Sequence, residues 1–358
     1  MKGRRVYVKL SFKITIITHK VWSGILVIKY AIAFLASGLC FLLGTSAAET
    51  VNSAANIFLG LSEAPILIKP FMKHMTDSEL FVVMAGGFAS IAGSVFGAII
   101  EFKIQKEHLL TACLMGAPGA LALSKLSFPE ILKSKITIKS IREYKTEEKY
   151  INCLDAILSG ARIALSICAA IMAALIAMIS ILSFADSICV WIFSMFGRKH
   201  IDFQYLLSYF FYPMVWMLGI SHYDSLTAGR LFGLKTFVNE FKAFSDLGNI
   251  ISTRDLILNN GTNSSCQLHN SSFILLDDKS VVVMTYALCG FSNISSIAIV
   301  LGSLSVLAPT KTHVFNKYVV KALLIAIATN LITACFASCL YVPTTDSTLL
   351  DICPGFRN

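Results

Sequence analysis

The chain has 358 residues, of which 56% are hydrophobic and only 14% are charged. Soluble domains carry about 25% charged residues, so this composition, with a mean hydropathy of +0.71, excludes a water-soluble globular protein. The net charge of +9 indicates basic cytosolic loops rather than nucleic-acid binding. The sequence therefore predicts an all-α polytopic membrane protein whose main solvent is lipid.

Apolar segments of crossing length recur along the chain. A helix needs about 20 residues to cross the hydrocarbon core, and the uncharged segment 163–184 is the clearest case. We expect six crossings, at residues 22–43, 80–100, 109–128, 163–184, 281–307 and 322–341.

Two further apolar segments contain residues that interrupt helices. Residues 50–72 include Glu63 and Pro65, and residues 203–244 include Pro213, several glycines and a glutamate. This pattern is typical of re-entrant hairpins, whose freed backbone groups are buried in protein or face a water-filled cavity. A pair of interfacial amphipathic segments is the alternative.

The order of these segments occurs twice, which predicts an inverted repeat of the kind found in secondary transporters. We expect a basic N-terminal segment (1–20), a scaffold helix (21–44), a first repeat (45–130), a cytosolic basic loop (131–152), a second scaffold helix with an amphipathic segment (153–200), a second repeat (201–341) and an extracellular tail (342–358). Within the repeats we expect hairpins at 50–72 and 203–246, spans at 80–101, 108–128, 280–308 and 316–341, and an extracellular loop at 247–278.

Charge and sequons predict the orientation. The loop 131–152 is rich in Lys and Arg, which places it in the cytosol, so the loop 247–278 falls outside. That outer loop contains three glycosylation sequons, at Asn260, Asn263 and Asn270. The two features agree and indicate a multi-pass plasma-membrane glycoprotein.

Two glutamates lie in the broken segments, Glu63 in the first and Glu240 in the second. A carboxylate inside a membrane costs about 2.5 kcal/mol or more, so each needs a partner. Either they cap helix ends or pair with a lysine, or they accept hydrogen bonds from a polar solute. Asn293 and Ser296 are expected on one helical face, either binding the same solute or joining two helices.

Neutral oxygen ligands also lie near the breaks. Asn56 and Ser90 could bind a hard cation such as sodium, although both residue types also cap helices. The sequence contains no H-E-x-x-H, G-x-S-x-G or P-loop motif. We therefore expect no enzymatic activity and no cofactor beyond a coupling ion.

Five segments of the chain match a known pattern in order and spacing: NIFLGLSEAPILIKPF (56–71), GGFASIAGSVFGA (86–98), GAPGALALSKLSFPE (116–130), KTFVNEF (235–241) and YALCGFSNISSIAI (286–299). With these motifs the chain resembles the concentrative nucleoside transporters over residues 21–341. The resemblance implies a homotrimeric sodium-coupled nucleoside symporter, in which two hairpins and two unwound helices enclose the nucleoside.

The resemblance also implies roles for individual residues. It implies ribose contacts from Glu240, Asn293 and Ser296, with Phe291 nearby. It implies contacts to the base from Gly60, Leu61, Ser62 and Glu63, with Ser94 and Val95 close to them. It implies a sodium site formed by the side chains of Asn56 and Ser90 and the carbonyls of Leu59 and Ile91.

Departures from the family pattern refine this interpretation. Many members have glutamine where this chain has Leu61, and pyrimidine-preferring members have serine where it has Gly60, whereas Ser94 is shared with pyrimidine and broad-specificity members. Loss of an amide that could bond a base edge changes discrimination strongly, so we expect purine nucleosides as substrates.

The family usually has two more crossings and an interfacial helix before residue 22, so we expect a truncated gene model. A non-transporting nucleoside-binding or regulatory subunit is the alternative function, and proton coupling is the alternative to sodium.

Overall fold

The computed structural model describes residues 45–132, 134, 136, 153–197, 203–260 and 276–342. All regular secondary structure in these ranges is helical, with no strand, which confirms the all-α class. Several predicted features lie outside the described residues: the segments 1–20 and 21–44, the sequon residues Asn263 and Asn270, and residues 343–358 of the tail. The sequon residue Asn260 is the last residue of a helix.

The chain divides into two compact units. The first contains residues Met1–Ala98, Cys113–Ile179 and Cys289–Thr329, and the second contains Ile99–Ala112, Ser180–Leu288 and Asn330–Asn358. Each unit therefore combines segments that are distant in the sequence.

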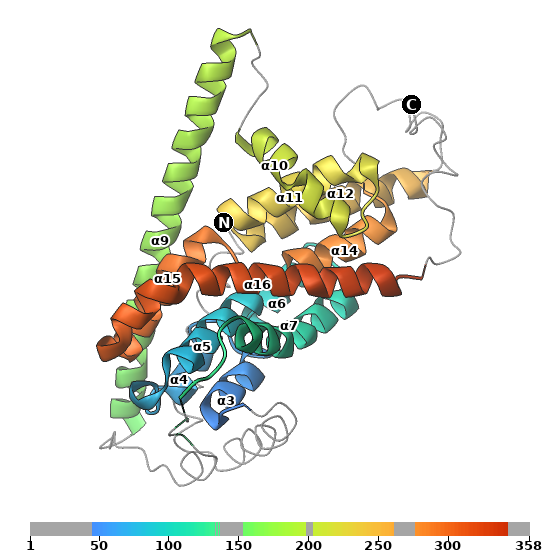
Figure 1. Cartoon of the computed structure of the whole chain (residues 1–358). Helices are drawn as coiled ribbons and strands as arrows, with labels where there is room; N and C mark the ends of the chain where they lie inside the picture. The colour runs from blue at the N-terminus through green and yellow to red at the C-terminus, as the bar shows by residue number, and fades with distance from the viewer. Residues whose placement is uncertain are drawn as a thin grey trace. The chain divides into compact units, whose positions relative to one another are not determined.

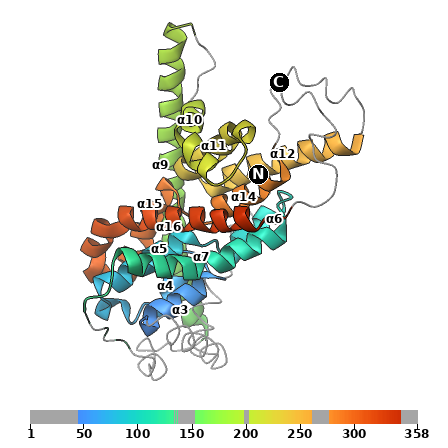
Figure 2. The ribbon, with the colours of Figure 1, turned by 45° about the vertical axis from the view of Figure 1, so that its right-hand side comes forward.

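Short helices form the start of the first unit. Its elements are α3 (Ala47–Asn56), α4 (Ala64–Ile68), the 3-10 helix η1 (Met72–His74), α5 (Asp77–Ala89), most of α6 (Gly93–Ile100), α15 (Ile294–Leu307) and the 3-10 helix η3 (Pro309–Lys311). Parts of α7 (Lys106–Ser127), α9 (Cys153–Met195) and α16 (Thr312–Leu340) also belong to it. Helix α3 packs against α4 and α5, beside which it lies in Figures 1 and 2.

Two apolar segments, each predicted from hydropathy to form one continuous helix, are divided into two helices. Residues 90–92 separate α5 from α6, and residues 289–293 separate α14 (Asp278–Leu288) from α15. Gly290 has a φ of +103°, a backbone conformation that side chains with a Cβ rarely adopt. We call these non-helical segments the first break (90–92) and the second break (289–293).

The second unit is built on a pair of helices, α10 (Phe203–Met217) and α11 (His222–Phe237), which pack along each other. A Cβ on Gly229 would lie 2.6 Å from the Ser208 carbonyl oxygen, so glycine allows this close approach. Helices α12 (Glu240–Asn260) and α14 both contact α11. The Asp224 carboxylate joins α11 to α14 by accepting from the Ser280 hydroxyl at 2.5 Å.

Two helices in the described ranges are long and apolar enough to cross a membrane. They are α7 (Lys106–Ser127) and the η3–α16 segment (Pro309–Leu340). The apolar helix Ile294–Leu307 is shorter, and the expected crossing at 163–184 lies within α9, a helix of 43 residues.

Candidate functional site

The two breaks and the loop between α3 and α4 meet in the first unit. The Gly93 N–H donates to the Phe58 carbonyl at 3.0 Å, and the Phe291 N–H donates to the Ser90 carbonyl at 3.2 Å. We call the region formed by residues 56–63, the first break and the second break the helix-break junction. It brings together backbone groups from three non-helical segments far apart in the sequence.

Asn56 carries an unsatisfied amide at this junction. Its side chain is fully buried, and neither its oxygen nor its nitrogen has a hydrogen-bond partner among the described residues. A Cβ on Gly86 would come 2.9 Å from the Asn56 Nδ2 atom, and the Gly86 carbonyl accepts a hydrogen bond from the Ser90 hydroxyl at 2.9 Å. Since an unpaired buried amide costs about 1–3 kcal/mol, this arrangement favours a bound polar ligand.

The loop between α3 and α4 holds the residues predicted to contact the base. Glu63 occupies the N-cap position of α4, but its side chain makes no capping hydrogen bond. A Cβ on Gly60 would collide with the Glu63 carboxylate and lie 2.9 Å from the Ala92 Cβ. Leu61 and Ser62 are both buried, and the Ser62 hydroxyl has no partner among the described residues.

Asn293 is the N-cap of α15, and Ser296 lies in the first turn of that helix. The Asn293 Oδ1 atom accepts from the Ser296 N–H and hydroxyl, both at 2.8 Å, and from the Ser295 hydroxyl at 2.7 Å. The prediction that Asn293 and Ser296 lie on one face of a continuous helix was therefore wrong, because Asn293 precedes the helix as its N-cap. The two side chains are nevertheless in direct contact and buried.

The other predicted ligands of the first unit take ordinary packing positions. Ile91, Val95 and Phe291 are buried, with exposed fractions of 1%, 0% and 6%. Leu59 packs against the small apolar cluster between α3 and α4. Ser94 lies in α6.

Glu240 belongs to the second unit, where it is the first residue of α12 and is buried. Asn239 directly before it accepts from the Lys242 N–H at 2.8 Å, which caps the helix. Lys235 is fully buried, and its ammonium donates to the Ala287 carbonyl at 2.8 Å, near the end of α14. Glu240 thus lies at the N-terminal end of a helix, where the partial positive charge stabilises a carboxylate.

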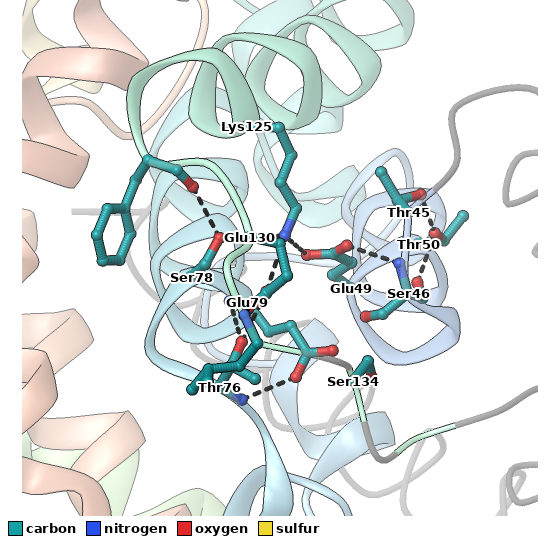
Figure 3. Close-up of polar contacts among 12 residues, drawn as sticks. Thr45, Ser46, Glu49, Thr50, Thr76, Ser78, Glu79, Lys125, Glu130 and Ser134 are labelled. Atoms are coloured by element: carbon teal, nitrogen blue, oxygen red, sulfur yellow. Dashed lines mark hydrogen bonds and ion pairs between the residues drawn. The ribbon is translucent and has the colours of Figure 1, made fainter.

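An ion cluster that the sequence interpretation missed joins α3 to α7 (Figure 3). The Lys125 ammonium lies 2.8 Å from the buried Glu49 carboxylate and 3.4 Å from the Glu130 carboxylate. It also donates to the Ser78 hydroxyl at 3.1 Å, and the Ser46 N–H donates to Glu49 at 2.7 Å. The S-x-x-E pattern at 46–49 was a detectable capping signal, but the pairing with Lys125 was not detectable from spacing.

We expect Lys125→Met to destabilise the protein strongly. The change leaves the Glu49 side chain, 1% exposed, without its cation, and breaking a buried pair from one side costs about 3–5 kcal/mol. Thermal denaturation in detergent measures this as a fall in Tm. Lys106→Met is the matched control on the same helix, because the Lys106–Glu107 pair is 70% exposed on both sides and should contribute below about 1 kcal/mol. The double variant Lys125→Met/Glu49→Gln should recover part of the lost Tm, because it also removes the unpaired carboxylate. Equal Tm values for all variants would contradict a stabilising role of the Lys125–Glu49 ion pair.

Comparison with known proteins connects this geometry to a family. Residues 108–338 match the family described as "Na+ dependent nucleoside transporter C-terminus". The chain is 39% identical over 298 residues to Solute carrier family 28 member 3 of Mus musculus, and 40% identical over 302 residues to Sodium/nucleoside cotransporter 2 of Mus musculus. These alignments cover 83% and 84% of this chain and 41% and 44% of the relatives, so the chain spans less than half their length.

Solved structures agree with the sequence matches. CNTnw in an inward-facing substrate-bound state has a TM-score of 0.74 at 30% identity, covering 93% of this chain and 72% of that one. A CNTnw variant in the intermediate 3 state has a TM-score of 0.77 at 30% identity, covering 93% and 74%. The structural similarity therefore extends over most of this chain.

Proposed function

Because this chain belongs to the sodium-dependent nucleoside transporter family, we propose that it carries nucleosides across the plasma membrane together with sodium. The observation that carries the proposal is the helix-break junction, where a buried, unpaired amide lies beside non-helical backbone. The similarity to Sodium/nucleoside cotransporter 2 of Mus musculus supports the same pairing of ion and solute.

Sodium binds at the helix-break junction in this proposal. The Asn56 and Ser90 side chains and the Leu59 and Ile91 carbonyls supply oxygen ligands, which suit a hard cation. The buried Asn56 oxygen, which has no protein partner in the described residues, is the group that a cation would satisfy. Bound sodium would hold the α3–α4 loop and the first break together, so nucleoside should bind the ion-loaded form more tightly, and linkage requires the reverse.

The nucleoside is bound by polar side chains and by the α3–α4 loop in this proposal. Asn293, Ser296 and Glu240 bind the ribose hydroxyls, with Phe291 close by, and the α3–α4 loop with Ser94 and Val95 contacts the base. The Asn293 oxygen accepts three hydrogen bonds, which fix the position of this side chain beside Ser296. Glu240, at a helix N-terminus, accepts hydrogen bonds from hydroxyl groups.

Purine nucleosides such as adenosine, guanosine and inosine are the proposed substrates. Leu61 is buried in the loop that contacts the base and offers no hydrogen bond to a base edge. The room at Gly60 is filled by the Glu63 carboxylate, so a serine at this position would displace Glu63.

We expect Leu61→Gln to increase uptake of cytidine relative to adenosine by about tenfold, because a matched polar contact contributes about 1.5 kcal/mol. Competition between the two labelled nucleosides in expressing cells measures the ratio. Phe58→Gln is the matched control in the same loop, since Phe58 is 68% exposed and should leave the ratio unchanged. Robust cytidine uptake by the wild type, with no gain from Leu61→Gln, would contradict the purine preference.

The wider architecture follows the family in this proposal. Two re-entrant hairpins and an inverted repeat provide alternating access, three copies form a homotrimer, and the outer loop is glycosylated at Asn260, Asn263 and Asn270. The paired helices α3–α4 and α10–α11 support the hairpins.

Uptake of radiolabelled adenosine into cells expressing this chain tests the proposal. We expect accumulation with external sodium and none with choline, alongside surface labelling that establishes delivery to the plasma membrane. Uptake in an acidified, sodium-free buffer would show that protons, rather than sodium, are the coupling ion. Saturable binding without accumulation would instead indicate a non-transporting subunit.

A further inference from the structure

One exposed face of α16, the red helix in Figure 1, changes from basic to apolar along its length. His313, Lys317 and Lys321 follow one another at intervals of four residues, so they lie on the same face of the helix, and all three are exposed. Val320 and Leu324 continue this face with exposed fractions of 55% and 59%. The change from basic to apolar side chains takes about three turns of helix.

Further basic residues lie beside the start of this helix. The Lys311 ammonium donates to the Met75 carbonyl at 3.0 Å, which joins η3 to the residue that follows η1. Lys73 and His74, the last two residues of η1, are exposed. We call this group the basic end of α16, and it consists of Lys73, His74, Lys311, His313, Lys317 and Lys321.

Carboxylates of the first unit do not neutralise these lysines. No lysine of the basic end has a carboxylate partner among the described residues. Nearby acidic side chains have other roles: Glu49 and Glu130 pair with Lys125, and Glu79 accepts from the Thr76 N–H. Asp77 lies in the first turn of α5, where the helix N-terminus stabilises its charge. The four lysines therefore leave an excess of positive charge.

An aromatic cluster places the basic end at a membrane–water interface. Tyr318 packs against Phe128 and Phe81, with ring centroids 5.0 and 6.4 Å apart, and tyrosine is enriched at this depth. The Lys317 ammonium lies 5.0 Å from the centroid of the Tyr318 ring, an attractive cation–π distance that orients it. In the η3–α16 segment only 33% of the most apolar window is buried, so much of this helix is open to lipid.

We propose that the basic end of α16 binds the headgroup of an anionic phospholipid such as phosphatidylserine, with an acyl chain along Val320 and Leu324. Basic excess places this end in the cytosol, where the leaflet carries anionic lipids, and clusters of about four to eight lysines or arginines beside a spanning helix are typical of sites for them. The Lys321 stem lies along the apolar surface while its ammonium reaches the phosphate. This site goes beyond the proposed function, because it uses neither sodium nor nucleoside.

Fluorescent phosphatidylserine titrated with the purified full chain in neutral detergent tests the site by anisotropy, with phosphatidylcholine as the uncharged comparison. We expect wild type to bind phosphatidylserine preferentially. Lys317→Gln and Lys321→Gln should each weaken binding about fivefold, and the double variant about 25-fold. Substituting arginine at both positions keeps the charge and should preserve the binding. Equal affinity of the wild type for the two lipids would overturn the proposal.

Lys106→Gln is the matched control, because it removes one charge from a lysine that is 70% exposed and lies at the other end of α7 from Phe128. It should bind phosphatidylserine as the wild type does. A loss equal to that of Lys321→Gln would mean that binding follows net charge alone, which would overturn a site on α16.

Two measurements on the wild type need no variant. Potassium chloride should weaken the binding of phosphatidylserine, because salt screens exposed charges, and binding that is independent of salt would contradict the role of the lysines. Glycerophosphoserine, which has the headgroup without acyl chains, should not displace the lipid at equal concentration. Displacement would overturn the lipid assignment in favour of a site for soluble anions. None of these readouts depends on transport, so a failure of uptake leaves the test intact.

Discussion

Asn56→Leu should strongly weaken the sodium dependence of uptake while raising the stability of the protein. The substitution removes an oxygen ligand from the proposed sodium site, so we expect the half-saturating sodium concentration to rise more than tenfold, which corresponds to about 1.4 kcal/mol or more. It also replaces an unpaired buried amide by an apolar group of similar size, which stabilises the sodium-free protein by about 1 kcal/mol. Uptake against sodium concentration and Tm in sodium-free buffer measure the two effects.

Asn52→Leu is the matched control for this prediction. Asn52 lies one turn earlier on α3, is equally buried, and also has neither amide atom paired among the described residues. Its substitution should raise Tm in the same way and leave the sodium dependence unchanged. Equal loss of sodium dependence in both variants would assign the effect to α3 as a whole, and a fall in Tm for Asn56→Leu would contradict the unpaired state of its amide.

Glu240→Gln should weaken nucleoside binding by about 10- to 100-fold at saturating sodium. The change keeps the volume of the side chain but removes its charge, and a hydrogen bond to a charged group contributes about 1.5–3 kcal/mol. The half-saturating adenosine concentration measures the effect. Glu107→Gln, at an exposed position of α7, should leave this value unchanged.

Deoxynucleosides distinguish a ribose contact from a structural role of Glu240. If the carboxylate binds a ribose hydroxyl, the nucleoside lacking that hydroxyl should bind wild type and Glu240→Gln almost equally, because the interaction is absent in both. A loss of the same size for adenosine and for every deoxyadenosine would show that Glu240 acts through the fold.

Long apolar helices were the features most readily predicted from the sequence. Segments α7 and α16 follow from length and hydropathy alone, since a helix in lipid needs little beyond apolar side chains. The all-α class followed from composition for the same reason.

The breaks inside apolar segments could not be predicted from hydropathy. Residues 90–92 and 289–293 are too short to interrupt the hydropathy of the apolar segments around them. Their conformation depends on tertiary hydrogen bonds such as that from the Phe291 N–H to the Ser90 carbonyl. The N-cap role of Asn293 had a local signal, because this asparagine lies three residues before a serine whose N–H it accepts. The long apolar segments on both sides nevertheless favoured a continuous helix.

Contacts between distant segments were equally hidden. Lys125 pairs with Glu49 from 76 positions away, and Cys113 meets Cys289 across 176 positions. A single sequence contains no distance information at such separations, so only the fold could bring these side chains together.

Nucleoside-driven sodium entry into proteoliposomes that contain only the purified chain is the most direct test of the central claim. We expect external adenosine to increase the influx of radioactive sodium, with both fluxes strongly reduced in Asn56→Leu at sodium concentrations that saturate the wild type, and retained in Asn52→Leu. Adenosine flux without accompanying sodium flux, or sodium influx unaffected by adenosine, would contradict coupled transport through the helix-break junction.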